Sequence, residues 1–362
     1  SYKTVDELLD MFAVQGALTE EEYFAAIQNT NEIAAACEDF SLDGSIKYPI
    51  LYGSQEEDER IFEARAWESL DEKLASGIIP ESQEQAFRTA IAEELRVFSK
   101  LKMSGFMLSM SDLIRWCKEN GMAIGTARGS VGGSRAAYVT DIIDLNPETW
   151  HTVFSRFCNE DREEIGDIDV DVVYDDRPRI FEYITSRFGA DKTARVAAYG
   201  TIKARGVIDV VRMAKCEANP EERNALFKIT DKLKAELEPL ETIAKSENIP
   251  VSKVAGFHAI SKKYPDFFYY YDGLIDTRIS QSVHPAGMVI SPITLDDNYG
   301  IFIKDGETCL LMDMEEAHEV GVAKYDFLAL KTVKVIRDTC NYIGIPYPST
   351  HSVNWDDQEV WK

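Results

Sequence analysis

Three aspartates recur at every second position of the segment 166–173, at Asp167, Asp169 and Asp171. In a β-strand, residues i, i+2 and i+4 project from the same face, so these carboxylates would stand in one row. Unpaired carboxylates repel one another, and a hard divalent cation such as Mg²⁺ relieves that repulsion. Because Asp167 and Asp171 would lie about 13 Å apart, we expect one adjacent pair to share the ion. The alternative is an edge strand whose acids prevent aggregation.

A glycine-rich loop precedes this row, with the sequence G-T-A-R-G-S-V-G-G-S over residues 125–134. Glycines let backbone N–H groups approach an anion, and the N-terminus of a following helix would add positive charge. Arg128 and Ser130, which flank Gly129, could donate hydrogen bonds to phosphate oxygens. The loop lacks the residue order of a P-loop or of a dinucleotide-binding fold. It is therefore either a phosphate cradle of another kind or a flexible turn.

Two further candidates lie near the C-terminal end of the chain. Asp326 is an acid in an otherwise apolar segment, where a charge is costly unless it is paired or bound to a metal. Lys324 could contact phosphate, or the two residues could form a simple salt bridge at the end of a strand. His284 precedes the apolar run 288–290, where a lone histidine has either a structural or a direct role.

The elements that must position these residues alternate between helices and short strands. Apolar residues at helical spacing predict helices over the N-terminal part, with Thr19 as an N-cap and Glu22 at the capping-box position. The predicted helices are 4–12, 19–37, 56–76, 81–100, 111–120, 178–188, 201–216 and 328–342, with mainly helical structure over 220–271. The predicted strands are 122–125, 167–173, 196–199, 287–291, 300–303, 309–312 and 322–327. We expect an α/β or α+β fold in which a helical insertion divides the sheet region.

The length of 362 residues favours two or three subdomains, and the composition is that of a globular protein. No apolar run could span a membrane, and the N-terminus lacks a basic, apolar signal region. Six scattered cysteines give neither a zinc motif nor a dense disulfide framework. We therefore expect a soluble, cytoplasmic protein.

The net charge of −24 argues at first against nucleic-acid binding, because an acidic surface repels phosphates. The acidic excess is confined to 1–100, 141–180 and 291–362, whereas 101–140 and 181–290 carry a small positive excess. We expect weak, salt-sensitive DNA binding by this chain.

Taken in order, the motifs resemble those of the family C bacterial replicative DNA polymerases, the DNA polymerase III alpha subunits. The resemblance covers nearly the whole chain, although Gly166, Ala329 and Arg135 depart from the family's usual residues. The similar segments are the R-G-S-x-x-G-S-x-x-A-Y loop at 128–138, the D-I-D-V-D strand at 167–171, the Y-G-T turn at 199–201, the H-P-A-G-M-V-I segment at 284–290 and the K-Y-D-F-L-A-L-K-T segment at 324–332.

The resemblance implies a polymerase β-like nucleotidyltransferase palm interrupted by a helical thumb. It places the first part of the palm, with N-terminal helices, at 1–198, the thumb at 199–276 and the second part of the palm at 277–334. Residues 335–362 would be the start of truncated fingers. The chain then looks like a catalytic core fragment.

The resemblance also implies the site and its chemistry. Asp167, Asp169 and Asp326 would bind two Mg²⁺ ions, with Mn²⁺ as an alternative. Asp171 is left out because some family members carry Asn there.

The loop Arg128-Gly129-Ser130 would hold the triphosphate of a dNTP, and Lys324 with either Lys203 or Arg205 would also contact phosphate. The implied reaction is two-metal transfer of a nucleotide to a primer 3′-hydroxyl on primer-template DNA, with release of pyrophosphate.

Two other functions are also consistent with the sequence. The chain could be a non-catalytic module that binds DNA or a replisome partner, because the remaining fingers and other domains of the family are missing. It could also be another two-metal phosphotransferase or hydrolase, since the carboxylates alone suit one. Other replisome subunits would bind through regions missing from this chain.

Overall fold

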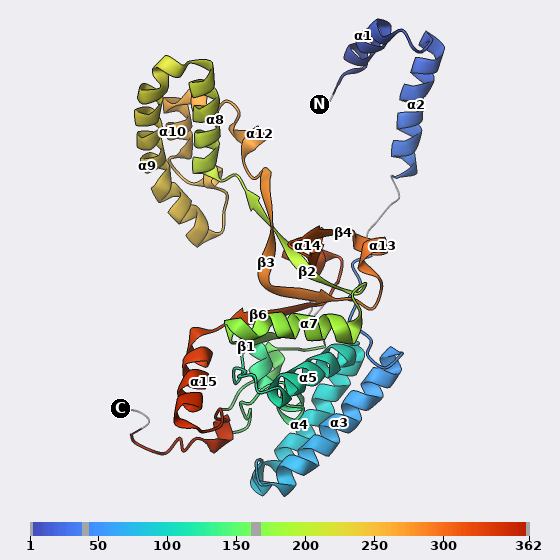
Figure 1. The fold of residues 1–362 in the computed structure, drawn as a ribbon, viewed down its shortest axis with the longest axis vertical. Coiled ribbons are helices and arrows are strands. Elements are labelled where there is room, and N and C mark those ends of the chain that lie inside the picture. Colours follow the sequence, from blue (N-terminus) through green and yellow to red (C-terminus); the bar gives the residue numbers. More distant parts are fainter. Residues whose placement is uncertain (1–2, 38–42, 161–167, 360–362) are drawn as a thin grey trace. The chain divides into compact units, whose positions relative to one another are not determined.

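A computed structural model describes residues 3–37, 43–160 and 168–359 of the chain. The chain divides into two compact units, Ser1–Ser45 and Ile46–Lys362. Figure 1 shows the helices and strands of both units, coloured along the sequence. Each unit is described by itself.

The first unit consists of two helices, α1 (Val5–Gln15) and α2 (Glu20–Ala36). The predicted N-cap of the second helix is confirmed: the Thr19 hydroxyl accepts from the Glu22 N–H, and the Glu22 carboxylate accepts from the Thr19 N–H at 2.8 Å. Tyr23 is the one buried apolar residue among the described residues of this unit. Caps, rather than a large core, therefore stabilise these helices.

Three long helices pack together at the start of the second unit: α3 (Gln55–Ala75), α4 (Glu84–Lys100) and α5 (Ser104–Glu119) (Figure 1). The predictions for 56–76 and 81–100 are confirmed, with a 3₁₀ turn at Glu81–Gln83 before α4. The prediction for 111–120 began seven residues too late. Every residue of the first two turns of α5 is buried, so that part of the sequence lacks the polar face on which helical periodicity depends.

A six-stranded mixed sheet adjoins these helices, in the order β1-β6-β3-β2-β5-β4. β1 is parallel to β6, β2 is parallel to β5, and the other neighbouring pairs are antiparallel. The strands are β1 (Asp169–Val172), β2 (Thr193–Thr201), β3 (Arg278–Ile290), β4 (Ile301–Lys304), β5 (Glu307–Leu310) and β6 (Lys324–Ala329). The mixed order confirms the expected α/β or α+β class.

Three strand predictions differ clearly from the structure. β2 begins three residues earlier than predicted, in the buried segment 193–195, and β3 begins nine residues earlier because 278–282 pairs with 198–201 as a ribbon that has no fully buried residue. Such a ribbon lacks the alternation of apolar and polar residues that marks a half-buried strand. The predicted strand 122–125 is reduced to a single antiparallel bridge between Ile124 and Val172.

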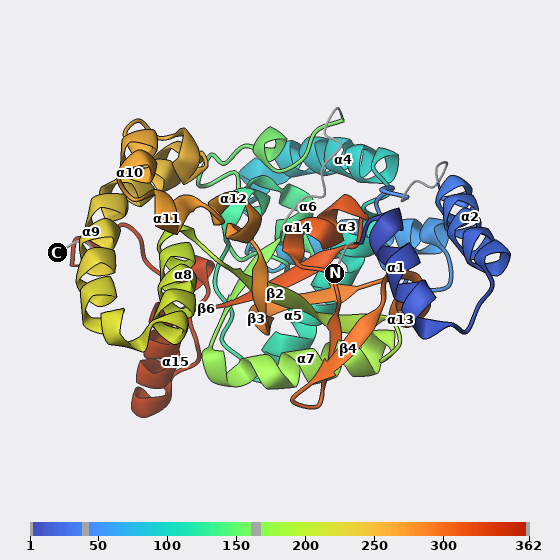
Figure 2. The ribbon, with the colours of Figure 1, turned by 90° about the horizontal axis from the view of Figure 1, so that it is seen from above.

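A second hydrophobic core forms among the helices α8 to α12, which Figures 1 and 2 both show grouped together. Leu233 and Leu237 of α9 and Val207 and Ile208 of α8 lie at its centre. The helices are α8 (Ala204–Ala218), α9 (Arg223–Glu247), α10 (Phe257–Lys263), α11 (Pro265–Phe268) and α12 (Tyr271–Leu274). The prediction that 220–271 is mainly helical is confirmed.

The remaining helices are short or lie beside the sheet. They are α6 (Arg135–Val139), α7 (Arg177–Phe188), α13 (Leu295–Tyr299), α14 (Met314–Glu319) and α15 (Lys331–Ile343). None of the helices in the described ranges combines the length and the apolarity needed to cross a membrane.

Candidate functional site

Asp169 and Asp326 come together on two neighbouring parallel strands. They are register partners in the pairing of β1 with β6, so their side chains project from the same face of the sheet. Val170 and Val172, which alternate with the aspartates, are buried, as the alternating pattern predicts. Asp167 lies outside the described residues.

The Asp326 carboxylate is buried and incompletely paired. Its exposed fraction is 8%, and its Oδ2 lies 2.7 Å from the Lys324 ammonium, so the predicted salt bridge is present. Its Oδ1 has no hydrogen-bond partner among the described residues. A buried polar atom without a partner costs about 1–3 kcal/mol, and such atoms mark sites for water, ions or ligands. A Cβ on Gly287, the register partner of Asp326 on β3, would lie only 3.1 Å from this oxygen.

His284 has a structural contact beside Asp326. Its Nδ1 accepts a hydrogen bond from the Gly287 N–H at 2.9 Å, and burial lowers the pKa of the imidazole. Arg195 of β2 donates to the carbonyl oxygens of His284 and Pro285 at 2.9 and 3.0 Å, and Arg177 donates to the same Pro285 oxygen at 3.0 Å. The hydrogen bond that the His284 ring accepts from the Gly287 N–H fits a structural role for His284, one of the two roles expected from the sequence. The role of Arg195 was missed, although a charged residue within an apolar strand was a signal for it.

The glycine-rich loop lies against the acidic row, as the predicted site requires. The Gly125 N–H donates to the Asp171 carbonyl oxygen at 2.8 Å. The Arg128 guanidinium lies 3.5 Å from Asp169 Oδ2 and 3.0 Å from Asp171 Oδ1. Residues that the sequence placed in two separate motifs therefore form one charged cluster.

The middle of the loop is a 3₁₀ helix, η2 (Gly129–Gly133), with Arg128 immediately before it. Gly129 has φ = 71°, in the left-handed region that favours glycine. Arg128 and Gly129 are exposed, and Ser130 is half-buried. This arrangement leaves the Arg128-Gly129-Ser130 segment at the surface, where a ligand can reach it.

The helix that follows the loop does not offer its N-terminus to a ligand, which corrects the sequence-based expectation. The buried Glu94 carboxylate of α4 accepts from the N–H groups of Arg135 and Ala136, both at 2.9 Å, and from the Ser134 hydroxyl at 2.7 Å. Burial raises the pKa of Glu94 to about 7. Helix α6 also has only five residues. Glu94 was missed, although its place on the apolar face of α4 was a signal.

Lys203 is the exposed N-cap residue of α8, and Arg205 lies in the first turn of that helix, half-buried. The Lys203 ammonium is 2.8 Å from Asp276, and the Arg205 guanidinium is 2.6 Å from Glu241 and 3.3 Å from Glu238. Both basic residues line a cavity of about 560 Å³ among these helices. Their predicted contact with phosphate stays a prediction.

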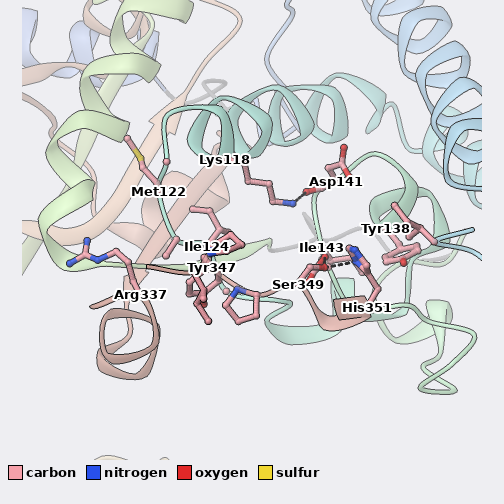
Figure 3. Close-up of a pocket in the computed structure, with 18 of the residues that line it drawn as sticks. Lys118, Met122, Ile124, Tyr138, Asp141, Ile143, Arg337, Tyr347, Ser349 and His351 are labelled. Carbon is pink, nitrogen blue, oxygen red and sulfur yellow. Dashed lines mark hydrogen bonds between the residues drawn. The ribbon is translucent and has the colours of Figure 1, made fainter. Parts of the chain in front are cut away.

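A cavity of about 550 Å³ lies beside the segment 121–125 that leads into the loop. Figure 3 shows Lys118 pointing toward Asp141 at its wall, and the ammonium donates to the Asp141 carbonyl oxygen at 3.0 Å. The Ser349 hydroxyl and His351 Nδ1 are 2.6 Å apart, and the same hydroxyl donates to Asp144 at 2.6 Å. Polar groups of this cavity therefore pair with one another.

Within the ranges that the structure describes, no three or more His, Cys, Asp or Glu side chains are arranged to hold a metal ion. Arg128 and Lys324 both contact the carboxylates, while the third predicted ligand, Asp167, lies outside those ranges. Two of the three predicted metal ligands, Asp169 and Asp326, are among the described residues and lie on adjacent strands.

The fold and this charged cluster define a mixed α/β protein with paired carboxylates beside a glycine-rich loop. Residues 60–329 match the family described as the bacterial DNA polymerase III alpha NTPase domain. The match covers most of this chain, and the chain therefore belongs to the bacterial DNA polymerase III alpha family.

Curated relatives named DNA polymerase III subunit alpha are similar over much of the chain. The Campylobacter jejuni protein is 30% identical over 97% of this chain and 31% of its own length. The Aquifex aeolicus protein is 29% identical over 75% of this chain and 25% of its own. The Pseudomonas fluorescens protein is 27% identical over 92% of this chain and 28% of its own length. The chain thus spans between a quarter and a third of the length of these relatives.

Proposed function

We propose that this chain carries the catalytic core for template-directed DNA synthesis, by transfer of a nucleotide from a dNTP to a primer 3′-hydroxyl. The observation that carries the proposal is the juxtaposition of Asp169 and Asp326 on adjacent strands, with Arg128 of the glycine-rich loop contacting Asp169. Membership of the polymerase family supports the same reaction. Pyrophosphate is the second product.

The residues present fit divalent metal ions. The unpaired, buried Oδ1 of Asp326 is a carboxylate oxygen of the kind that Mg²⁺ binds, and Asp169 projects from the same face. Asp169 and Asp326, with Asp167, would hold two Mg²⁺ ions, or Mn²⁺. Bound there, the metal would supply Lewis-acid chemistry: it would lower the pKa of the primer hydroxyl and stabilise the charge of the leaving pyrophosphate.

The basic residues of the site would bind and orient the triphosphate. In the chain alone, the Arg128 guanidinium pairs with Asp169 and Asp171 and partly neutralises them. A triphosphate would compete for the same guanidinium, because phosphate oxygens match its donor geometry. Gly129 and Ser130 would add donors next to Arg128. Lys324 would contact phosphate from β6, and Lys203 or Arg205 from the start of α8.

The domain roles follow from the same proposal. The two parts of the palm would be 1–198, which includes the N-terminal helices, and 277–334. The helical core of 199–276 would be the thumb, and 335–362 would begin the fingers. The partners would be primer-template DNA and, through other regions of the complete polypeptide, further replisome subunits.

The test is the Mg²⁺-dependent affinity for dGTP, measured by calorimetry on the unaltered chain and on Asp326→Asn. We expect the substitution to weaken the affinity by about tenfold or more, because it removes a negative oxygen at the metal site. The control is Asp231→Asn, an exposed carboxylate on α9, which should change nothing. Equal affinity in the Asp326 variant and the unaltered chain would sink the site assignment.

A primer-extension assay separates this proposal from a non-catalytic binding role. Extension by a polypeptide of the relatives' full length that contains this chain, and its loss with Asp326→Asn, would support a catalytic core. A full-length polypeptide whose extension activity survives the substitution would favour the binding role for this region.

A further inference from the structure

Glu94 occupies a position where the helical pattern calls for an apolar residue. On α4, Phe87, Ile91 and Phe98 are fully buried and recur at helical spacing with Glu94 between them. The exposed fraction of Glu94 is 1%. Because burial of a carboxylate is unfavourable unless it is hydrogen-bonded, its position must be explained by what it contacts.

Glu94 completes the N-terminus of α6. Its Oε1 accepts from the Arg135 N–H, and its Oε2 accepts from the Ala136 N–H and the Ser134 hydroxyl. The Ser134 oxygen accepts in turn from the Ala137 N–H at 3.0 Å. The first three N–H groups of the helix, which no helical carbonyl could satisfy, thus all have acceptors.

The same contacts fix the end of the glycine-rich loop. Ser134 follows η2 directly, so the first residue that Glu94 binds is the last residue of the loop motif. The Arg135 guanidinium donates to the Gly133 carbonyl oxygen at 2.8 Å and lies 2.7 Å from Glu148. The other end of the loop is held at Gly125 by β1. Arg128 and Gly129 lie between these two anchored ends.

We propose that Glu94 is a positioning residue for the phosphate-binding loop: it fixes Ser134 and the start of α6, and thereby the place of the Arg128-Gly129-Ser130 segment beside Asp169. This inference rests on the proposed function for its statement that the loop binds phosphate. The contacts of Glu94 with the loop do not depend on that function.

Above its pKa of about 7, Glu94 is ionised, and its three donors require a carboxylate there rather than an amide. Glutamine has nearly the same shape, but one of its two terminal groups is a donor. In one orientation its NH₂ faces the Arg135 N–H, and in the other it faces the Ala136 N–H. Either orientation sets a donor against a buried donor, so the first turn of α6 loses a hydrogen bond.

The experiment compares Glu94→Gln with Glu93→Gln in the 362-residue chain. Glu93 is the neighbouring exposed residue on α4, where it pairs with Arg96, so its substitution removes the same charge without touching the loop. Hydrogen exchange is followed at the amides of 128–137 and, as a measure of folding, at those of β6. Affinity for dGTP with Mg²⁺ is measured on the same samples.

We expect Glu94→Gln to raise exchange at 128–137 by about tenfold and to weaken dGTP affinity by a similar factor, with β6 still protected. Glu93→Gln should change neither quantity. Ser134→Ala, which removes the hydrogen bond to Glu94 and the one from the Ala137 N–H, should raise exchange and weaken dGTP affinity in the same direction. It serves as the second variant if Glu94→Gln does not fold.

Unchanged exchange at 128–137 in folded Glu94→Gln would overturn the positioning role. Raised exchange with unchanged dGTP affinity would overturn the link from Glu94 to phosphate binding. If the unaltered chain does not bind dGTP, the proposed function fails and the phosphate part of the inference fails with it. The exchange result then decides the positioning part alone.

Discussion

At the scale of single residues, Asp169 and Asp171 project from the same face of β1 but have different neighbours. Asp169 lies opposite Asp326, whereas Asp171 lies opposite Leu328 and pairs with Arg128 at 3.0 Å. The period-two spacing predicted that the two side chains share a face. It could not predict which one meets Asp326, because that depends on the register between strands far apart in sequence.

This difference predicts unequal effects of the same substitution. Asp169→Asn should weaken Mg²⁺-dependent dGTP affinity by about tenfold or more, since it removes a carboxylate beside Asp326. Asp171→Asn should leave the affinity unchanged or increase it, because it releases Arg128 from a competing ion pair. Calorimetric titration of both variants measures the two values. Equal losses of affinity would show that Asp171 is as important as Asp169.

At the scale of elements, amphipathic helices were predictable and fully buried or fully exposed segments were not. The helix α4 has one apolar face, so its periodicity marks it. The start of α5 is buried on all sides, and the β2–β3 ribbon has no fully buried residue at 278–282, so neither shows that signal. The link from Glu94 on α4 to α6 is a tertiary contact that local pattern cannot reveal.

That link predicts a pH-dependent contribution to stability. Burial raises the pKa of Glu94 from 4.5 to about 7, against the opposing effects of its hydrogen bonds and of the Arg135 charge. Between pH 4.5 and 7 the folded chain therefore keeps a proton that the unfolded chain has lost. As pH rises through that window, the contribution of Glu94 to the free energy of unfolding falls by about 3 kcal/mol, and above pH 7 it is constant.

Urea unfolding at pH 5 and at pH 8 tests this dependence in the unaltered chain and in Glu94→Gln. The free energy of unfolding of the unaltered chain should decline more between the two pH values, because glutamine does not titrate. The same decline in both chains would mean that Glu94 has an ordinary pKa in the folded state.

At the scale of the whole molecule, the second unit brings the chemical groups together from distant segments. The sheet order places β6 between β1 and β3, so the aspartates of 169–171, the segment 284–287 and the pair Lys324 and Asp326 meet on three adjacent strands. Motif order in the sequence indicated one site. The strand order that creates it depends on long-range pairing, which local sequence patterns do not specify.

This arrangement changes what the net charge of −24 implies about phosphate binding. Part of the negative charge lies in the acidic row, which Arg128 partly neutralises, and in Asp326, which pairs with Lys324. An acidic chain can therefore hold a site for phosphate and metal. Its affinity for duplex DNA alone should still be weak and should fall as salt rises.

Metal-directed cleavage can show whether Asp169 and Asp326 form a metal site. Fe²⁺ replaces Mg²⁺ in a sample of the chain with dGTP. Ascorbate and hydrogen peroxide then generate radicals at the bound metal, and mass spectrometry maps the peptide bonds that are broken. We expect cleavage within 167–171, 284–287 and 324–327, and its loss in Asp326→Asn. Cleavage at other segments, or the same pattern in Asp326→Asn, would contradict this metal site.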